Sequence, residues 1–166
     1  IETIGKLQRS GDTVRRIEGC PSGTLGFLFG QLERGRSFSE SLRIAVSLGY
    51  TEPDPREDLL GRDVARKGLI LGRLLGFRGE LHDVSVEPLV PAEFLDLETA
   101  VFLSRIAELD EAWNERVRSA HARSCVLRYR LRVTRRRVVA GVVEVSRTES
   151  GPQYGTDNRF TFTTIR

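Results

Sequence analysis

An aspartate and a lysine stand four residues apart in a segment with helical periodicity, Arg62 to Gly76. With successive residues placed about 100° apart, Asp63 and Lys67 fall within the apolar face of this helix. Burying an unpaired ion costs several kcal/mol, so the two charges must pair with each other or line a cavity. An acid four residues before a lysine can reach it, and one alternative is a structural ion pair that fixes the helix register. The other residues of the predicted apolar face are Leu60, Val64, Ile70, Leu71, Leu74 and Leu75.

The loop before this helix, from Gly49 to Gly61, brings more carboxylates to the same helix end. Glu52 and Asp58 are expected to line the same cleft as Lys67. The alternative is a solvated acidic turn, because negative charge is favoured near a helix N-terminus. A lysine flanked by carboxylates can pass a proton to an oxygen on which charge develops, while the carboxylates hold a cationic part of a ligand. The acids of this loop are Glu52, Asp54, Glu57 and Asp58.

A second candidate site lies at Pro21-Ser22-Gly23-Thr24, which opens an apolar helical segment that runs to Leu32. Free backbone N–H groups at a helix start form a site for a carboxylate or a phosphate. The alternative is that the serine and threonine here only cap the helix.

The remaining elements must position these residues. Patterns of capping and periodicity predict further helices through Ser10, from about Ser37 to Leu48 and from about Leu97 to Ala122. Apolar and polar residues alternate from Cys125 to Thr134, which is typical of a strand with one buried face. Further strands are expected at Val14 to Gly19, Val139 to Val145 and Phe160 to Ile165. Helices first and strands later predict one α+β domain over residues 1–166, with a mixed or antiparallel sheet covered by helices.

The composition excludes several classes of protein. Of 166 residues, 39% are hydrophobic and 30% are charged, as in soluble globular proteins, and no apolar run approaches the length of a membrane-spanning helix. A net charge of +3 is too weak to imply nucleic acid by itself. The cysteines and histidines are too few for a disulfide framework or a zinc site, so no metal is expected and both cysteines are predicted to be reduced and buried. These residues are Cys20, Cys125, His82 and His121.

Three segments resemble the homoserine dehydrogenase family. Ala45 to Lys67, AVSLGYTEPDPREDLLGRDVARK, resembles the family signature, in which Ala, Gly, an Asp-Pro pair, Asp, Gly, Asp and a final Lys recur at set spacings. Ile17 to Phe29, IEGCPSGTLGFLF, resembles the family segment around its Ser-Gly-Thr, and Gly155 to Thr164, GTDNRFTFTT, resembles a strand near the end of that region. The likeness covers nearly the whole chain.

This resemblance implies a reaction and a role for each site residue. The family interconverts L-aspartate 4-semialdehyde and L-homoserine with NADP or NAD, on the route to threonine, methionine and isoleucine. By the resemblance, Lys67 donates the proton to the aldehyde oxygen, and Asp63 positions Lys67 and contacts the substrate. Glu52 binds the substrate amino group, and Asp58 lies near the reacting hydroxyl. Gly23 and Thr24 meet the substrate carboxylate, and Gly49 with Tyr50 lies where substrate and nicotinamide come together.

The resemblance also implies a longer, cytoplasmic enzyme of which this chain is the catalytic and dimer-forming region. The glycine-rich dinucleotide fingerprint and the metal-binding loop of the family are expected before Ile1, so we expect the 166-residue chain alone to bind no nicotinamide cofactor and to show no turnover. A homodimer through the apolar faces of the strands is expected, burying about 2,000 Å² or more.

The competing interpretation is a non-enzymatic module that binds anionic ligands or nucleic acid through an arginine-rich strand. An arginine stripe on an exposed sheet face can hold phosphates. Against it, aromatic residues are nearly absent from that face, because Tyr129 lies on the other one. The arginines concerned are Arg128, Arg130, Arg132, Arg135, Arg136 and Arg137.

Overall fold

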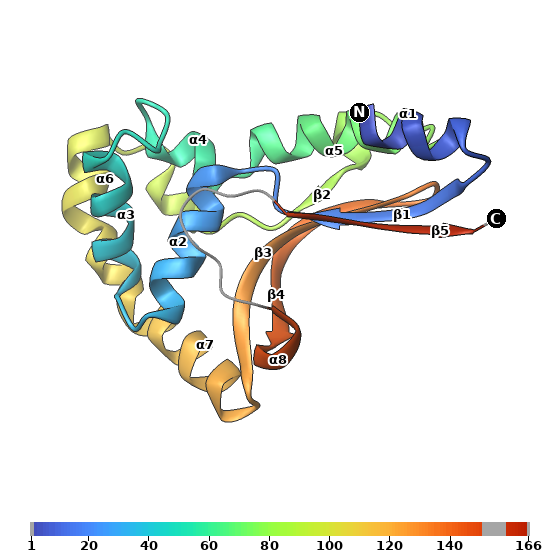
Figure 1. The fold of residues 1–166 in the computed structure, drawn as a ribbon. Coiled ribbons are helices and arrows are strands. Elements are labelled where there is room, and N and C mark those ends of the chain that lie inside the picture. The colour runs from blue at the N-terminus through green and yellow to red at the C-terminus, as the bar shows by residue number, and fades with distance from the viewer. Residues whose placement is uncertain (1, 151–158, 166) are drawn as a thin grey trace.

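The computed structural model describes residues 2–150 and 159–165, and the strands in these ranges form one mixed sheet of five (Figure 1). The sheet order is β2-β4-β3-β1-β5. All neighbours are antiparallel except β2 and β4, which are parallel. This confirms the predicted α+β fold and each predicted strand, whereas Gly155 to Asn158 lie outside the described residues. The strands are β1 (Thr13–Gly19), β2 (Ser85–Val86), β3 (Cys125–Thr134), β4 (Val138–Ser146) and β5 (Phe160–Ile165).

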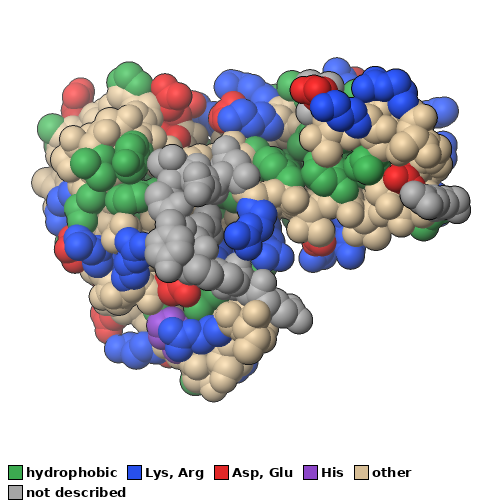
Figure 2. All heavy atoms as spheres, in the orientation of Figure 1, with side chains coloured by type: hydrophobic (Ala, Val, Ile, Leu, Met, Phe, Trp, Pro, Cys, Tyr) green, Lys and Arg blue, Asp and Glu red, His purple; other side chains and the backbone are tan. Residues whose placement is uncertain are grey.

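Helices cover the sheet and pack on one another beside it (Figure 1). Hydrophobic side chains form a band between α1 and α5 and the strands beneath them (Figure 2). Away from the strands, the Trp113 ring stacks on Phe38 at 4.8 Å and meets the edge of Phe29 at 5.8 Å, which joins three helices in one core. The helices are α1 (Glu2–Arg9), α2 (Gly23–Glu33), α3 (Phe38–Ser47), α4 (Pro55–Leu59), α5 (Arg62–Leu74), α6 (Thr99–Arg105), α7 (Asp110–Ala122) and α8 (Arg147–Ser150).

The helix predicted from Leu97 to Ala122 is not continuous. It is divided into α6 and α7 by a 3₁₀ turn at Ile106–Leu109. Asp110 begins α7 with its carboxylate turned to another helix, where it accepts hydrogen bonds of 2.7 Å from the Ser39 N–H and hydroxyl. The first turn of α3 thus gains an acceptor for an N–H that a helix leaves unsatisfied, and this contact favours the break over a single long helix.

The proline loop also contains structure that was not predicted. Residues Pro55–Leu59 form the short helix α4, which starts with Pro55 in its first turn. Asp54 caps it by accepting a 3.0 Å hydrogen bond from the Arg56 N–H. Proline suits a first helical position because it has no N–H to leave unsatisfied. Asp-Pro therefore starts a helix here as well as ending the extended segment before it.

Helix α5 is present as predicted, but its buried face agrees with the predicted one only in part. Val64 is buried and Leu71 and Leu75 pack partly buried against the core, whereas Ile70 and Leu74 are exposed and Gly68 and Gly72 are buried in their place. A β-carbon on Gly68 would lie 2.8 Å from Leu131 Cδ1, and one on Gly72 would lie 2.8 Å from Val138 Cγ2. The glycines let the helix backbone approach β3 and β4 closely, so the helix is rotated away from the orientation that apolar side chains alone indicate. The buried residues of α5 are Val64, Ala65, Gly68 and Gly72.

Strand β3 has two buried faces along its first half, not one. Leu127, Tyr129 and the following odd-numbered positions are buried as predicted. Val126 and Arg128 on the other face are also buried, and the Arg128 guanidinium donates a 2.5 Å hydrogen bond to Glu33 at the end of α2. No helix of the described ranges is long and apolar enough to cross a membrane.

Candidate active site

A pocket of about 310 Å³ lies at the start of α5, where α2, the proline loop and α5 meet. The loop contributes Glu52, Glu57 and Asp58, and the first turns of α5 contribute Arg62, Asp63 and Arg66. Ser22 at the start of α2 completes the polar lining. Glu52 and Asp58 share this pocket as predicted, whereas Lys67, expected in the same cleft, is not among the residues that line it. Arg62 and Arg66 also line it, and Arg62 pairs with Glu57 at 2.6 Å.

Lys67 and Asp63 form the expected ion pair beside this pocket. Lys67 Nζ lies 2.5 Å from Asp63 Oδ2 and donates a second hydrogen bond of 3.0 Å to the Pro21 carbonyl. The two side chains are 48% and 61% exposed, so the prediction that they sit in an apolar wall is wrong for this chain. An ammonium group has three N–H donors, and these two contacts leave one for a ligand oxygen.

Asp58 joins the proline loop to α2 through its carboxylate. Oδ1 lies 2.9 Å from the Thr24 hydroxyl, and Oδ2 accepts a 2.8 Å hydrogen bond from the Glu52 N–H. The Thr24 hydroxyl is buried and also lies 2.5 Å from the Tyr50 carbonyl, so its single proton serves two acceptors. These contacts tie together four of the predicted site residues, two of which are 34 positions apart in the chain.

Gly49 and Tyr50 form an exposed turn after α3. Gly49 adopts the left-handed conformation, with φ of 68°, and its N–H donates to the Val46 carbonyl. The Tyr50 N–H donates to the Ala45 carbonyl, which completes the usual glycine-dependent closure of a helix. The Tyr50 ring meets the edge of Phe27 at 5.1 Å and stays 41% exposed. The turn therefore has a structural reason for its glycine and also presents an accessible surface.

Ser22 caps α2, which was the alternative to an anion site at this helix start. Its hydroxyl accepts a hydrogen bond of 3.2 Å from the Leu25 N–H, and Gly23 and Thr24 follow in the first helical turn. The N–H groups of a first turn have no partner within their own helix, so capping by Ser22 is compatible with an anion site at Gly23 and Thr24.

The two cysteines differ in burial. Cys20 is buried beside this helix start, donates to the Ser22 carbonyl at 3.3 Å, and has its pKa raised by that burial. Cys125 is free as well but only half-buried, so the prediction that both are buried holds for Cys20 alone.

Arg56 and Asp54 form a clamp behind the site that the sequence did not reveal. The Arg56 guanidinium is almost fully buried, donates to both Asp54 oxygens at 2.8–3.1 Å, and reaches the carbonyls of Phe94, Leu95 and Leu97. These hydrogen bonds hold the pKa of the Asp54 carboxyl below its usual range and raise the pKa of Arg56. The clamp fixes α4, and with it Asp58, to a segment 40 residues later.

The arginine-rich strand does not present a continuous basic stripe. Arg128 is buried against Glu33, and Arg132 pairs with Glu18 of β1 at 2.6 Å. Neutralised arginines of this kind stabilise the sheet and are poor sites for phosphate. The competing interpretation as a non-enzymatic binding module is therefore not favoured.

The family model of homoserine dehydrogenase matches residues 1–165. The chain belongs to the homoserine dehydrogenase family. A bifunctional aspartokinase/homoserine dehydrogenase of Haemophilus influenzae is 44% identical over 146 residues, which cover 87% of this chain and 18% of the relative. A homoserine dehydrogenase of Emericella nidulans is 37% identical over an alignment that covers 100% of this chain and 49% of the relative. This member of the family therefore spans about a fifth to a half of the length of such relatives.

Solved structures have the same fold as this homoserine dehydrogenase family member. A Candida auris protein of unknown function superposes with a TM-score of 0.90 at 34% identity, over 98% of this chain and 48% of that one. A putative homoserine dehydrogenase of Archaeoglobus fulgidus superposes with a TM-score of 0.74 at 22% identity, over 98% of this chain and 46% of that one. The resemblance noted in the sequence from Ala45 to Lys67 is confirmed at the level of the family.

Proposed function

We propose that this chain forms the substrate-binding and catalytic part of a homoserine dehydrogenase, which interconverts L-aspartate 4-semialdehyde and L-homoserine. The observation that carries the proposal is the Lys67–Asp63 pair beside a pocket lined by Glu52 and Asp58. The substrates carry an ammonium group, a carboxylate and a reacting oxygen, so they need partners of both signs in one small site. The pocket supplies both signs, and its volume suits a small amino acid.

In this proposal, the acids and the start of α2 grip the two ends of the substrate. Glu52 binds the ammonium group, because its side chain is exposed and lines the pocket. Gly23 and Thr24 take the carboxylate at the first turn of α2, where free N–H groups and the helix dipole favour an anion. Asp58 lies near the reacting hydroxyl, and each of its oxygens keeps a lone pair beyond the bond that it already accepts.

Lys67 and Asp63 then handle the proton. During reduction, the Lys67 ammonium donates a proton to the aldehyde oxygen and becomes neutral, and its half-exposed side chain regains a proton from solvent. In the reverse direction the neutral amine accepts the hydroxyl proton. Asp63 holds the amine in place on the same helix face and contacts the substrate.

A bound nicotinamide supplies or accepts the hydride in this reaction. The Gly49–Tyr50 turn fits the edge of such a ring, because the turn is exposed and a β-carbon on Gly49 would meet nothing within 4 Å. NADP or NAD is proposed as the cofactor. A hyperthermophilic archaeal homoserine dehydrogenase of this fold was solved in complex with NADPH, which supports the first of the two.

The wider context of the enzyme is part of the same proposal. Residues 1–166 form one catalytic and dimerisation domain, and two copies associate through the sheet. The complete protein acts in the cytoplasm in the biosynthesis of threonine, methionine and isoleucine, although some relatives are named as chloroplast proteins.

Replacing the lysine in the full-length enzyme tests the proposal. Lys67→Gln is expected to lower kcat by about 100-fold or more, because a positioned proton donor contributes about 10²–10⁴ to a rate. Lys6→Gln is a matched control, since Lys6 forms the same kind of exposed pair with Glu2, at 2.7 Å and four residues apart on α1. Steady-state rates with both substrates are the measurement. A Lys67→Gln enzyme within tenfold of wild type would refute the assignment.

A further inference from the structure

A second, larger cavity lies at the opposite end of α5 from the candidate active site. Its volume is about 950 Å³, and the arginines that line it come from three separate segments. Arg15 comes from β1, Arg78 follows the end of α5, and Arg135 and Arg136 stand in the turn between β3 and β4. Figure 1 shows this turn at the end of the sheet where β1 begins and β5 finishes. Lys and Arg side chains also gather over the neighbouring α1 and α5 in Figure 2.

The charges in this cavity differ from those of the other arginines. Its lining contains no Asp or Glu among the described residues, and none of the ion pairs recorded for those residues involves these four arginines. Like charges that lie close together repel one another, and proteins usually place acidic side chains nearby to neutralise them. Four arginines line this one cavity, and no acid among the described residues lines it with them.

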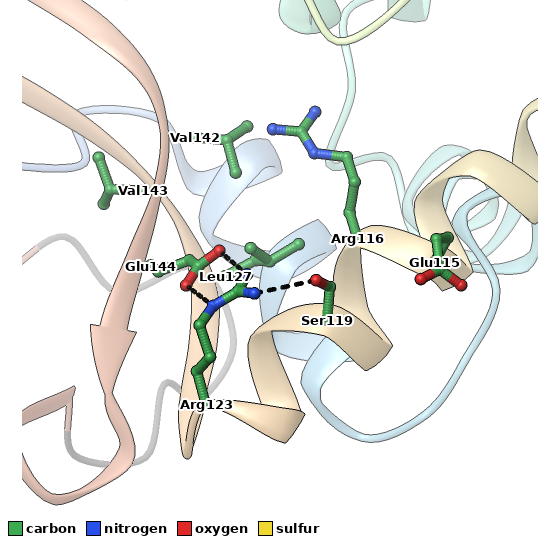
Figure 3. Close-up of a pocket in the computed structure, with 8 residues that line it drawn as sticks. All are labelled: Glu115, Arg116, Ser119, Arg123, Leu127, Val142, Val143 and Glu144. Carbon is green, nitrogen blue, oxygen red and sulfur yellow. Dashed lines mark hydrogen bonds and ion pairs between the residues drawn. The ribbon is translucent and has the colours of Figure 1, made fainter.

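The pocket between α7 and the β3–β4 pair provides the contrast (Figure 3). It also contains arginines, but there the Arg123 guanidinium faces Glu144 and contacts the Ser119 hydroxyl. Arg116 pairs with Glu87 at 3.1 Å and lies over the Trp113 ring. The arginines of that pocket are satisfied within the protein, whereas those at the end of α5 pair with no acid in the part of the chain that the structure describes.

The position of these arginines is fixed by the fold. Gly76 closes α5 and is followed by Phe77, which is buried and anchors the segment that carries Arg78. A β-carbon on Gly76 would lie 3.5 Å from Arg135 Nε, so the Arg135 side chain lies across the end of the helix. The turn of β3 and β4 is held by two hydrogen bonds of 3.0 Å between Thr134 and Arg137. These contacts place the backbones of the segment after α5 and of the β3–β4 turn before any ligand arrives.

We propose that this cavity binds a small molecule with several phosphate groups. Guanidinium groups present paired donors that match phosphate oxygens, and several of them together favour a ligand of high negative charge. The cavity is broad and open to solvent, so it has room for a ligand larger than a single inorganic ion. The shared chemistry is a chain of two or three phosphates, either free or carried by a nucleotide.

The site is separate from the proposed catalytic pocket. The two cavities lie at opposite ends of a helix of 13 residues, which is about 20 Å long at about 1.5 Å per residue. They share no lining residue. The inference therefore does not depend on the proposed dehydrogenase activity, and either can fail without the other.

Titration of the full-length protein with tripolyphosphate and with ATP tests the proposal. Calorimetry is performed with saturating NADPH present, so that any dinucleotide site elsewhere in the protein is filled. Binding is expected for at least one probe and should weaken as NaCl rises from about 0.05 M to about 0.2 M, because salt screens such contacts. Tighter binding of tripolyphosphate identifies the free phosphate chain as the ligand, and tighter binding of ATP identifies a nucleotide.

Matched double variants distinguish ligand binding at this site from a general effect of the protein's net charge. Arg78→Gln/Arg136→Gln is expected to weaken binding about tenfold or more, because each charge-assisted hydrogen bond contributes strongly to phosphate affinity. Arg36→Gln/Arg118→Gln removes the same charge from exposed positions already paired with acids, and should leave affinity within about twofold of wild type. Equal losses in both double variants, or no binding of either probe at millimolar concentration, would overturn the proposal. So would preferential binding of duplex DNA at the same sites.

Discussion

Gly68 lies where α5 crosses the sheet, and its replacement by alanine tests how the catalytic helix is held. The β-carbon of an alanine there would lie 2.8 Å from Leu131 Cδ1 and 2.9 Å from Val138 Cγ1. Carbon atoms normally approach to about 3.5–4.0 Å, so two overlaps arise at once. Leu131 and Val138 are both fully buried, with 0% exposure, so neither can relieve the overlap by moving into solvent.

Two opposing effects determine the size of the change. Overpacking of a filled core costs about 1–3 kcal/mol. Alanine in a helix interior is better than glycine by about 1 kcal/mol, which offsets part of that cost. The free energy of unfolding is therefore expected to fall by up to about 2 kcal/mol, which corresponds to a Tm lower by up to about 4–8 °C for a domain of this size.

Thermal unfolding of the full-length protein measures this change, and α1 offers a matched control. Gly5 is also inside a helix, but a β-carbon there would meet only the end of the flexible Arg9 side chain, at 3.3 Å. Gly5→Ala should therefore raise Tm slightly through helix propensity alone. If Gly68→Ala raises Tm as much as Gly5→Ala does, the close packing of α5 on β3 and β4 is wrong.

Two further substitutions test the contacts behind the site. Asp54→Asn should destabilise the protein at neutral pH, and the difference from wild type should disappear as pH falls below about 4. The hydrogen bonds from Arg56 lower the folded-state pKa of Asp54, so the stabilisation is present above the ordinary carboxyl value of about 3.9 and is lost as pH falls through the depressed pKa. A difference in Tm that persists unchanged at pH 2 would contradict this. Thr24→Val should raise KM about tenfold, because Asp58 loses a hydrogen-bond donor worth about 1–2 kcal/mol, and Thr24→Ser should restore it. Equal KM values for the valine and serine variants would exclude a role for the hydroxyl.

Local patterns in the sequence were enough to identify most of the elements. Ser37, at the predicted start of its helix, accepts from the Glu40 N–H at 3.2 Å, and the strand from Cys125 to Thr134 has the predicted bounds. The Asp63–Lys67 contact was also predictable, because two residues four apart on one helix meet whatever surrounds them. Such features depend on residues that are close in the chain, so local sequence patterns are enough to predict them.

Contacts between distant segments were decided only by the tertiary structure. Hydrophobicity indicated an apolar face with Ile70 and Leu74, yet α5 packs through Gly68, which has no side chain for a hydrophobic pattern to register. No local sequence pattern predicts the hydrogen bond between Thr24 and Asp58 or the contacts of Arg56 with the carbonyls of Leu95 and Leu97. The same holds for the arginines that three separate segments bring to one cavity. Periodicity describes one element at a time, whereas the orientation of an element depends on how closely two backbones can approach.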